Sequence, residues 1–102
     1  MSVSTRLLEN SNDLQIIVEG RFDFSLHKQF RDAYADNSEN VKTFTINLSQ
    51  TTYMDSSALG MILLLKDYAE KNNSKIVIYK PNESIQKILE IAQFNRLMDI
   101  IE

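Results

Sequence analysis

A short junction of one acid and two hydroxyl residues, Asp55-Ser56-Ser57, separates a strand-like segment from a long apolar segment. Upstream, Thr43–Leu48 alternates and is rich in β-branched and aromatic side chains, which favours a β-strand. Downstream, the apolar run Met61–Leu65 continues at helical length to Asn72-Asn73. With a further strand after the helix, this order predicts two parallel strands joined by a right-handed crossover.

Two alternating segments open the chain, Val3–Glu9 and Asp13–Gly20, on either side of the turn-prone triplet Asn10-Ser11-Asn12. They predict a β-hairpin. Ser25 is then expected to cap a helix whose apolar residues recur at three- and four-residue steps. A polar loop over Asp36–Asn40 leads on to the strand before the junction.

After the junction helix, Lys75–Tyr79 is an apolar run suited to a strand that is buried on both faces. Pro81 prevents the strand from continuing, Asn82 starts a further helix, and Leu97–Ile101 is expected to add a short final strand. The chain of 102 residues is long enough for one core and too short for a full doubly wound sheet. We therefore predict a single domain over residues 1–102, with an α/β fold in which a small mixed sheet carries its helices mainly on one face.

The junction itself allows two interpretations. Aspartate and serine are favoured at a helix start because their oxygens accept the first unpaired N–H groups, and Asp-Ser-Ser before an apolar helix is most often plain capping. The position also suits a switch. A phosphate on such a serine would meet the positive end of the helix dipole and spare backbone donors.

The junction helix divides by angle into two sides. The stripe expected to face the sheet consists of Ala58, Met61, Ile62, Leu65 and Ala69. The opposite side carries Ser56, Gly60, Leu63 and Asp67, flanked by Leu59 and Leu64, where a surface helix normally carries charges. Either neighbouring helices cover Leu59 and Leu64, or these leucines belong to a docking site; Leu63 is expected to be exposed in both cases. A glycine inside a helix costs about 1 kcal/mol relative to alanine, which predicts a packing or docking reason for Gly60.

Asp23 and Asp55 both follow strand-like segments, at the carboxyl ends where open α/β sheets place their sites. We expect the two acids to converge beside Ser56. Each acid also has a simpler interpretation, as the cap of a helix.

Several classes of function are excluded or disfavoured. A net charge of −3 with no cluster of basic residues argues against a nucleic-acid partner. With no cysteine and His27 as its single histidine, the chain is not expected to bind a metal or another cofactor. It contains no Gly-x-Ser-x-Gly motif and no phosphate-binding glycine loop, so we expect no catalytic residues. The segment Met1–Arg6 lacks an apolar signal core and no run reaches transmembrane length, which predicts a cytoplasmic protein without membrane insertion.

The segment Asp55–Gly60 resembles the Asp-Ser-Ser/Thr-Gly-Leu-Gly signature of the STAS family, the anti-sigma factor antagonists. A second segment, Gly20-Arg21-Phe22-Asp23, resembles that family's Gly-Glu-Leu-Asp at the end of an early strand. The spacing and the order of elements fit over nearly the whole chain. The departures are Ala58 where glycine is usual, and Arg21-Phe22 in place of Glu-Leu; neither removes a hydroxyl group.

The resemblance implies a regulatory protein without enzymatic activity, in which Ser56 is phosphorylated by a partner serine kinase. The unphosphorylated form would bind that kinase, often itself an anti-sigma factor or related regulator, and a serine phosphatase would restore the complex. The controlled programme would be transcription, stress response, motility or biofilm formation, and we expect a monomer. The predicted partner-binding residues are Asp23, Asp55, Ser57, Leu59, Gly60, Leu63 and Asp67. The alternative is a STAS subunit of a membrane transporter that docks on an ATPase without a phosphorylation cycle.

Overall fold

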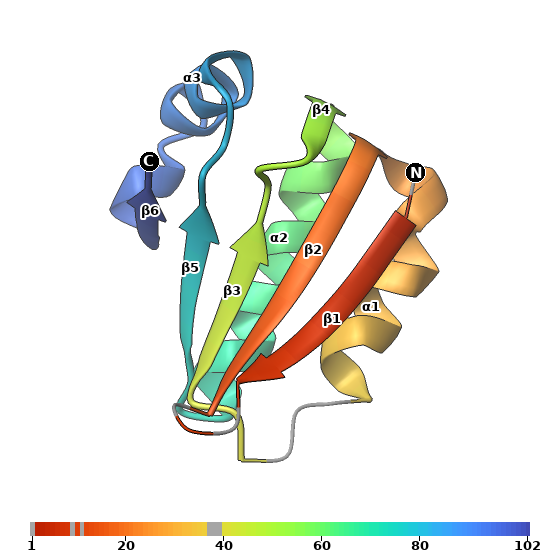
Figure 1. The fold of residues 1–102 in the computed structure, drawn as a ribbon. Coiled ribbons are helices and arrows are strands. Elements are labelled where there is room, and N and C mark those ends of the chain that lie inside the picture. The colour runs from red at the N-terminus through yellow and green to blue at the C-terminus, as the bar shows by residue number, and fades with distance from the viewer. Residues whose placement is uncertain (1, 9, 11, 37–39) are drawn as a thin grey trace.

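The computed structural model describes residues 2–8, 10, 12–36 and 40–102. Within these residues the chain forms six strands, three α-helices and two short 3-10 helices (Figure 1). In chain order they are β1 (Ser2–Leu8), β2 (Asp13–Phe22), η1 (Phe24–Leu26), α1 (His27–Ala35), β3 (Thr43–Asn47), β4 (Thr51–Met54), α2 (Ser56–Lys71), β5 (Lys75–Tyr79), α3 (Glu83–Ile91), η2 (Phe94–Arg96) and β6 (Asp99–Ile101).

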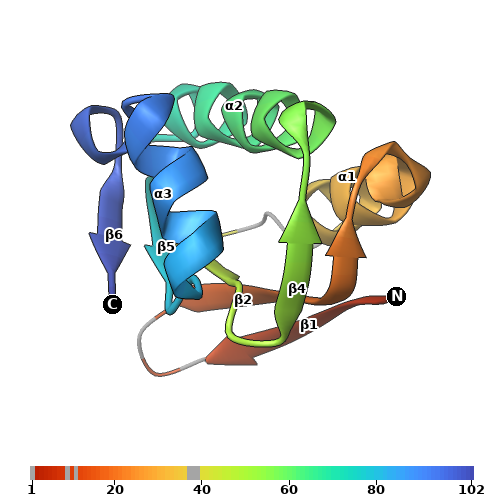
Figure 2. The same cartoon turned by 90° about the horizontal axis from the view of Figure 1, so that it is seen from above.

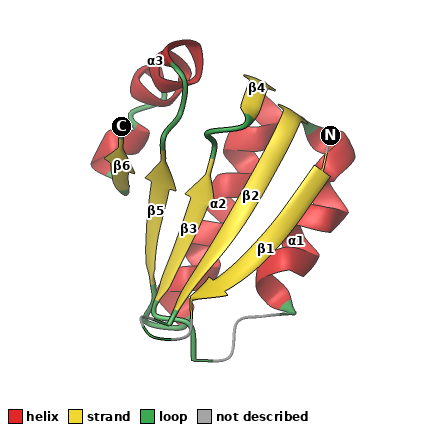
Figure 3. Cartoon of the chain, in the orientation of Figure 1, coloured by secondary structure: helices red, strands yellow, loops and turns green. Residues whose placement is uncertain are grey.

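The strands form a mixed sheet in the order β1-β2-β3-β5-β6, and β4 pairs with β2 outside this path. The β1–β2 pair is antiparallel, and the other pairs are parallel. Helices α1 and α2 lie against the same face of the sheet, and α3 lies near its end, beside β4 (Figures 2 and 3). The predicted α/β fold, a mixed sheet with helices mainly on one face, is confirmed.

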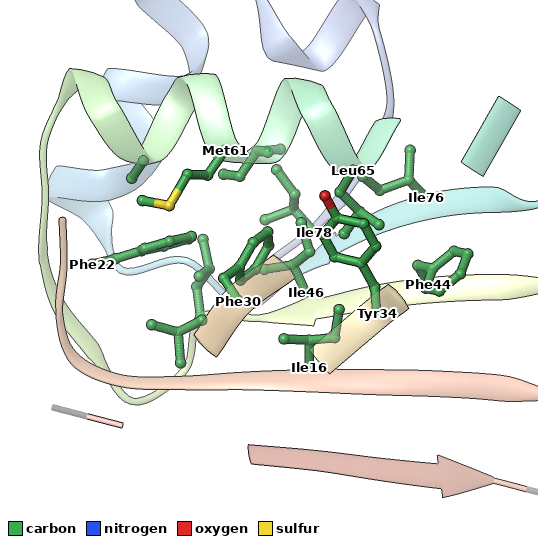
Figure 4. Packing of buried hydrophobic residues seen from close by; sticks show 14 of the residues in the cluster. Ile16, Phe22, Phe30, Tyr34, Phe44, Ile46, Met61, Leu65, Ile76 and Ile78 are labelled. Atoms are coloured by element: carbon green, nitrogen blue, oxygen red, sulfur yellow. The ribbon is translucent and has the colours of Figure 1, made fainter. Parts of the chain in front are cut away.

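The core lies between the sheet and the two helices behind it. Ile16, Ile46 and Ile78 are in register across β2, β3 and β5, and all three are fully buried. They face Met61 and Leu65 of α2 (Figure 4). Burying one such side chain stabilises the fold by about 1.5–3 kcal/mol, so this row fixes how α2 lies on the sheet.

Strand β2 changes partners at Gly20. Its first half, Asp13–Ile17, pairs with β3, and its last residues, Gly20–Phe22, pair with β4. Gly20 has a φ of 86°, and the register shifts between it and Arg21. A side chain would strain this left-handed backbone, which explains the glycine. The sequence suggested a turn at the end of a strand, whereas Gly20 lies inside β2.

Strand β4 is the element that the sequence analysis missed, since Thr51–Met54 was not expected to be a strand. The other expected strands and helices are present, with ends displaced by one to two residues: β2 extends to Phe22, and β3 ends at Asn47. The turn expected at Asn10-Ser11-Asn12 includes Ser11, which lies outside the described residues, as do residue 9 of the first strand and residues 37–39 of the expected polar loop.

Candidate functional site

Two turns with the same sequence pattern and the same hydrogen bonds lie side by side at one end of the molecule. The parallel strands β2 and β4 are in register at Phe22 and Met54, so Asp23 and Asp55 follow at equivalent positions. Each strand then leads into a helical turn with the pattern Asp-x-Ser. Seen from above, β4 and the end of β2 run side by side toward the helix layer (Figure 2). The expected convergence of Asp23 and Asp55 is therefore present.

The turn after β4 holds Asp55 as the cap of α2. One oxygen of the Asp55 carboxylate, Oδ1, accepts hydrogen bonds from the N–H groups of Ser57 (3.0 Å) and Ala58 (3.3 Å). The same oxygen accepts from the Ser57 hydroxyl at 2.5 Å. Of the two interpretations of the junction, these contacts confirm capping by Asp55. The expectation of spare donors is corrected for Ser57 and Ala58, because Asp55 already occupies both N–H groups.

Ser56 and Ser57 differ sharply in their surroundings. Ser57 is half-buried and its hydroxyl is engaged by Asp55. Ser56, the first residue of α2, is exposed, and nothing in the described part of the chain hydrogen-bonds to its hydroxyl. Of the two serines, Ser56 has the more exposed side chain.

The turn after β2 repeats the pattern with Asp23. Its Oδ1 accepts from the N–H of Ser25 (3.0 Å) and from the Ser25 hydroxyl (2.5 Å). Ser25 was expected to cap the helix; that prediction is wrong, because the cap of η1 is Asp23, and Leu26 precedes α1 without a side-chain cap. The two Ser25 donors, aided by the Arg21 guanidinium 3.6 Å away, hold the pKa of Asp23 below its usual range. Asp23 is therefore ionised at neutral pH.

Helix α2 has the two sides that its sequence predicted. The whole stripe expected to face the sheet is buried, namely Ala58, Met61, Ile62, Leu65 and Ala69. On the other side Ser56, Gly60 and Asp67 are exposed, and Leu63 exposes 42% of its surface. The expected exposure of Leu63 is confirmed.

The two flanking leucines have different environments. Leu59 is half-buried and packs against the core, whereas Leu64 exposes 58% of its surface beside α1. A Cβ atom added at Gly60 would meet no neighbouring atom within 4 Å. Packing within the described chain therefore does not explain this glycine, and of the two expected reasons docking stays a prediction.

Asp67 lies apart from the junction. It is eleven residues beyond Ser56, which is about three turns or roughly 16 Å along α2. Its carboxylate pairs with Lys71 at 3.3 Å on an exposed surface. The structure thus groups Asp23, Asp55, Ser56 and Ser57 at one end of the molecule, with Gly60 and Leu63 on the first two turns of α2, and leaves Asp67 at a distance.

Two exposed aromatic residues beside the junction, Phe24 and Tyr53, were not among the predicted site residues. Phe24 exposes 66% of its surface and stacks on His27, with ring centroids 4.9 Å apart. Tyr53 exposes 43%, and the Arg21 guanidinium lies 4.2 Å from the centre of its ring. The available signal was the alternation along the strand ends, in which Phe22 and Met54 are buried and the preceding residues, Arg21 and Tyr53, are exposed.

The described residues show no cluster of three metal-ligating side chains. Among the helices described, none has both the length and the apolar character that crossing a membrane requires.

Comparison with known families identifies the fold. A family model described as "Mlab, STAS domain" matches residues 5–101. The chain belongs to the STAS domain family. The resemblance carried by Asp55–Gly60 and Gly20–Asp23 is therefore confirmed at the level of the family.

Two relatives align with nearly all of this STAS chain. A STAS-domain containing protein of Pseudomonas aeruginosa (strain UCBPP-PA14) is 38% identical over 100 residues, covering 98% of this chain and 99% of that protein. The anti-sigma-B factor antagonist of Bacillus subtilis (strain 168) is 22% identical over 100 residues, covering 98% of this chain and 92% of that protein.

Solved structures share the STAS fold. The anti-sigma factor antagonist SpoIIAA in its unphosphorylated form matches with a TM-score of 0.77 and 16% identity, over 99% of this chain and 88% of that one. The phosphorylated form of the Bacillus protein SpoIIAA matches with a TM-score of 0.76 and 17% identity, over 99% and 92%. A sulfate transporter family protein of Wolinella succinogenes matches with a TM-score of 0.79 and 12% identity, over 88% and 76%.

Proposed function

We propose that this STAS protein is a non-enzymatic partner switch controlled by phosphorylation of Ser56. The unphosphorylated form binds a serine kinase that acts as an anti-sigma-type regulator, and phosphorylation releases it. A serine phosphatase restores binding. The protein acts as a monomer in the cytoplasm, and the pathway controls transcription or a programme such as stress response or biofilm formation.

One observation carries this proposal, the unengaged and exposed hydroxyl of Ser56 at the start of α2. The hydroxyl lies on the side of the helix that also presents Gly60 and the exposed Leu63. A partner that covers this side can therefore reach Ser56 without any unfolding of the domain. The names of two of its relatives, an anti-sigma-B factor antagonist and SpoIIAA, support the same role.

The release step follows from charge. A phosphate adds about −1.5 to −2 charges at neutral pH, directly after Asp55 and at the strand end shared with ionised Asp23. Because Asp55 already binds the N–H groups of Ser57 and Ala58, these two donors are not free to offset the new charge. The helix dipole favours the anion in the free protein, but an apolar interface beside two carboxylates opposes its desolvation.

We expect phosphorylation to act through the local surface charge and not through a change of fold. The chain shares its fold with both the unphosphorylated and the phosphorylated form of SpoIIAA, with TM-scores of 0.77 and 0.76.

A second candidate is a transporter subunit that docks on an ATPase without phosphorylation. The match to a sulfate transporter family protein supports this candidate at the level of the fold. Because the two chains are only 12% identical, the match supports nothing beyond the fold. The junction Asp55-Ser56-Ser57 followed by Gly60 favours the phosphorylated class instead.

The deciding experiment combines phosphate mapping with binding. The protein is incubated with ATP and each serine kinase of its host that carries an anti-sigma-type domain, and its peptides are mapped by mass spectrometry. We expect one phosphate, on Ser56, and loss of the complex on a size-exclusion column. Ser56→Ala serves as the control and should stay bound and unmodified. Phosphate confined to Ser57 would overturn the assignment, and co-purification of an unphosphorylated protein with a transporter ATPase would favour the second candidate.

A further inference from the structure

The two matching turns place Phe24 at the position that corresponds to Ser56. In each turn the aspartate accepts two hydrogen bonds from the serine two residues after it. The bond from the serine N–H is 3.0 Å long and the bond from the serine hydroxyl is 2.5 Å long, in both turns. The residue between them is exposed in both turns, and it is Phe24 in one and Ser56 in the other. Because β2 and β4 end in register, these two positions lie on the same end surface of the molecule (Figure 2).

A second aromatic ring extends this surface along the paired strands. Phe22 and Met54 point into the core, and the residues before them, Arg21 and Tyr53, are exposed. The Arg21 guanidinium lies 4.2 Å from the Tyr53 ring centre, and its Nε is 3.6 Å from Oδ2 of Asp23. Arg21 therefore contacts both the Tyr53 ring and the Asp23 carboxylate, and it links the ring to the turn after β2.

Phe24 and Tyr53 are the two exposed aromatic rings of this surface. Phe24 and Tyr53 expose 66% and 43% of their surfaces. Both have few rotatable bonds, and contacts hold them in place, Phe24 by stacking on His27 and Tyr53 by Arg21. Rigid aromatic side chains of this kind dominate binding energy when a partner covers them, since they bury a large area at a low entropic cost.

We propose that Phe24 and Tyr53 are the anchors by which the protein binds its kinase partner. The inference rests on the proposed function, because it takes the surface around Ser56 as the partner-binding surface. The partner must present an apolar pocket for Phe24, with a basic group at its rim to meet the carboxylate of Asp23. This arrangement explains why one phosphate suffices for release. The phosphate is added to Ser56, whose position in its turn corresponds to that of Phe24, and it lies on the surface from which the partner must exclude water.

The test measures kinase affinity for the full-length unphosphorylated protein by isothermal titration calorimetry. Phe24→Ala is expected to weaken binding at least tenfold, which corresponds to about 1.4 kcal/mol. Tyr53→Ala, whose ring also lies outside the core, is expected to weaken binding at least fivefold. The matched control is Ile91→Ala, because Ile91 is 84% exposed at the far end of α3 and loses a similar apolar area. It should bind within twofold of the wild type.

A kinetic readout separates anchoring from damage to the phosphorylation site. Phe24→Ala should raise the KM for phosphorylation of Ser56 and leave kcat unchanged, with a thermal unfolding midpoint close to that of the wild type. If the wild type binds and responds to Ser56 phosphorylation while both aromatic variants bind within twofold of it, the anchor proposal alone is overturned. If the wild type neither binds nor is phosphorylated by a kinase of its host, the proposed function and the anchor proposal both fail.

Discussion

Asn82 joins helix α3 to strand β4 by a hydrogen bond from its Nδ2 to the carbonyl oxygen of Thr51, across 3.2 Å. The other side-chain atom of Asn82, Oδ1, accepts from the N–H of Ile85 at 2.8 Å and caps the helix. Thr51 in turn donates its hydroxyl to the carbonyl oxygen of Val18 in β2 at 2.7 Å. These contacts connect α3, β4 and β2, and so support the strand that leads to Asp55.

Asn82→Ala should therefore lower the stability of the domain. It removes the cap of α3 and leaves the Thr51 carbonyl without this donor, and we expect a loss of about 1–2 kcal/mol. Urea unfolding followed by circular dichroism measures it. Asn95→Ala, at an exposed position in η2, is the control and should change the free energy of unfolding by less than about 0.5 kcal/mol. Equal stability of the two variants would mean that neither the cap of α3 nor the contact with β4 contributes to stability.

Charge at position 56 should control binding without altering the fold. Ser56→Asp is expected to weaken the kinase complex at least tenfold, since it places a carboxylate beside Asp55 and Asp23. Ser56→Ala should bind permanently, and both variants should melt within a few degrees of the wild type. Asn95→Asp adds the same charge away from the site and should leave affinity unchanged. Full affinity of Ser56→Asp would refute the repulsion mechanism.

The exposed side of α2 can be tested with two neighbouring leucines. Leu63→Arg should weaken the kinase complex and leave the domain folded, because Leu63 is partly exposed on the side of Ser56. Leu65→Arg should unfold it, because Leu65 is fully buried and an unpaired buried charge costs several kcal/mol. Thermal melting and a binding assay on both variants check this. A folded Leu63→Arg protein with wild-type affinity would show that the partner binds elsewhere.

The two glycines of the chain should respond in opposite ways to alanine. Gly60→Ala should stabilise the domain by about 0.5–1 kcal/mol, since the helix gains a better former and the added methyl group meets no neighbour. Gly20→Ala should destabilise it by about 1 kcal/mol or more, because its φ of 86° strains any side chain. Chemical denaturation gives both values. If Gly60 is kept for docking, Gly60→Ala will also weaken kinase binding; unchanged affinity would remove Gly60 from the interface.

The sequence predicted what depends on local periodicity. The buried stripe of α2 and the exposure of Leu63 follow from a period of 3.6 residues, and Asp55 as a cap follows from its place before an apolar helix. Strand β4 was missed because Thr51–Met54 is only four residues long and owes its form to pairing with β2. That pairing joins segments about thirty residues apart, so no local pattern encodes it.

The same long-range pairing explains one of the two errors around the first turn, and local hydrogen bonds explain the other. Gly20 was placed at a strand end because β2 was expected to stop there, whereas pairing with β4 extends it to Phe22. Ser25 was chosen as the cap because it directly precedes the helical pattern, but the Asp23 carboxylate accepts its N–H and hydroxyl instead. The exposure of Phe24 could not be predicted, because it depends on the turn that these contacts form.

The two hydrogen-bonded turns have a thermodynamic consequence for recognition. Asp23 and Asp55 are fixed by bonds to their own turns, and both turns are anchored on paired strands, so this surface exists before any partner arrives. Association then requires little ordering of the backbone, unlike the folding of a disordered segment upon binding. The heat capacity change on complex formation will therefore reflect the apolar area covered by the partner, and the bound and free forms of this domain will have nearly the same backbone.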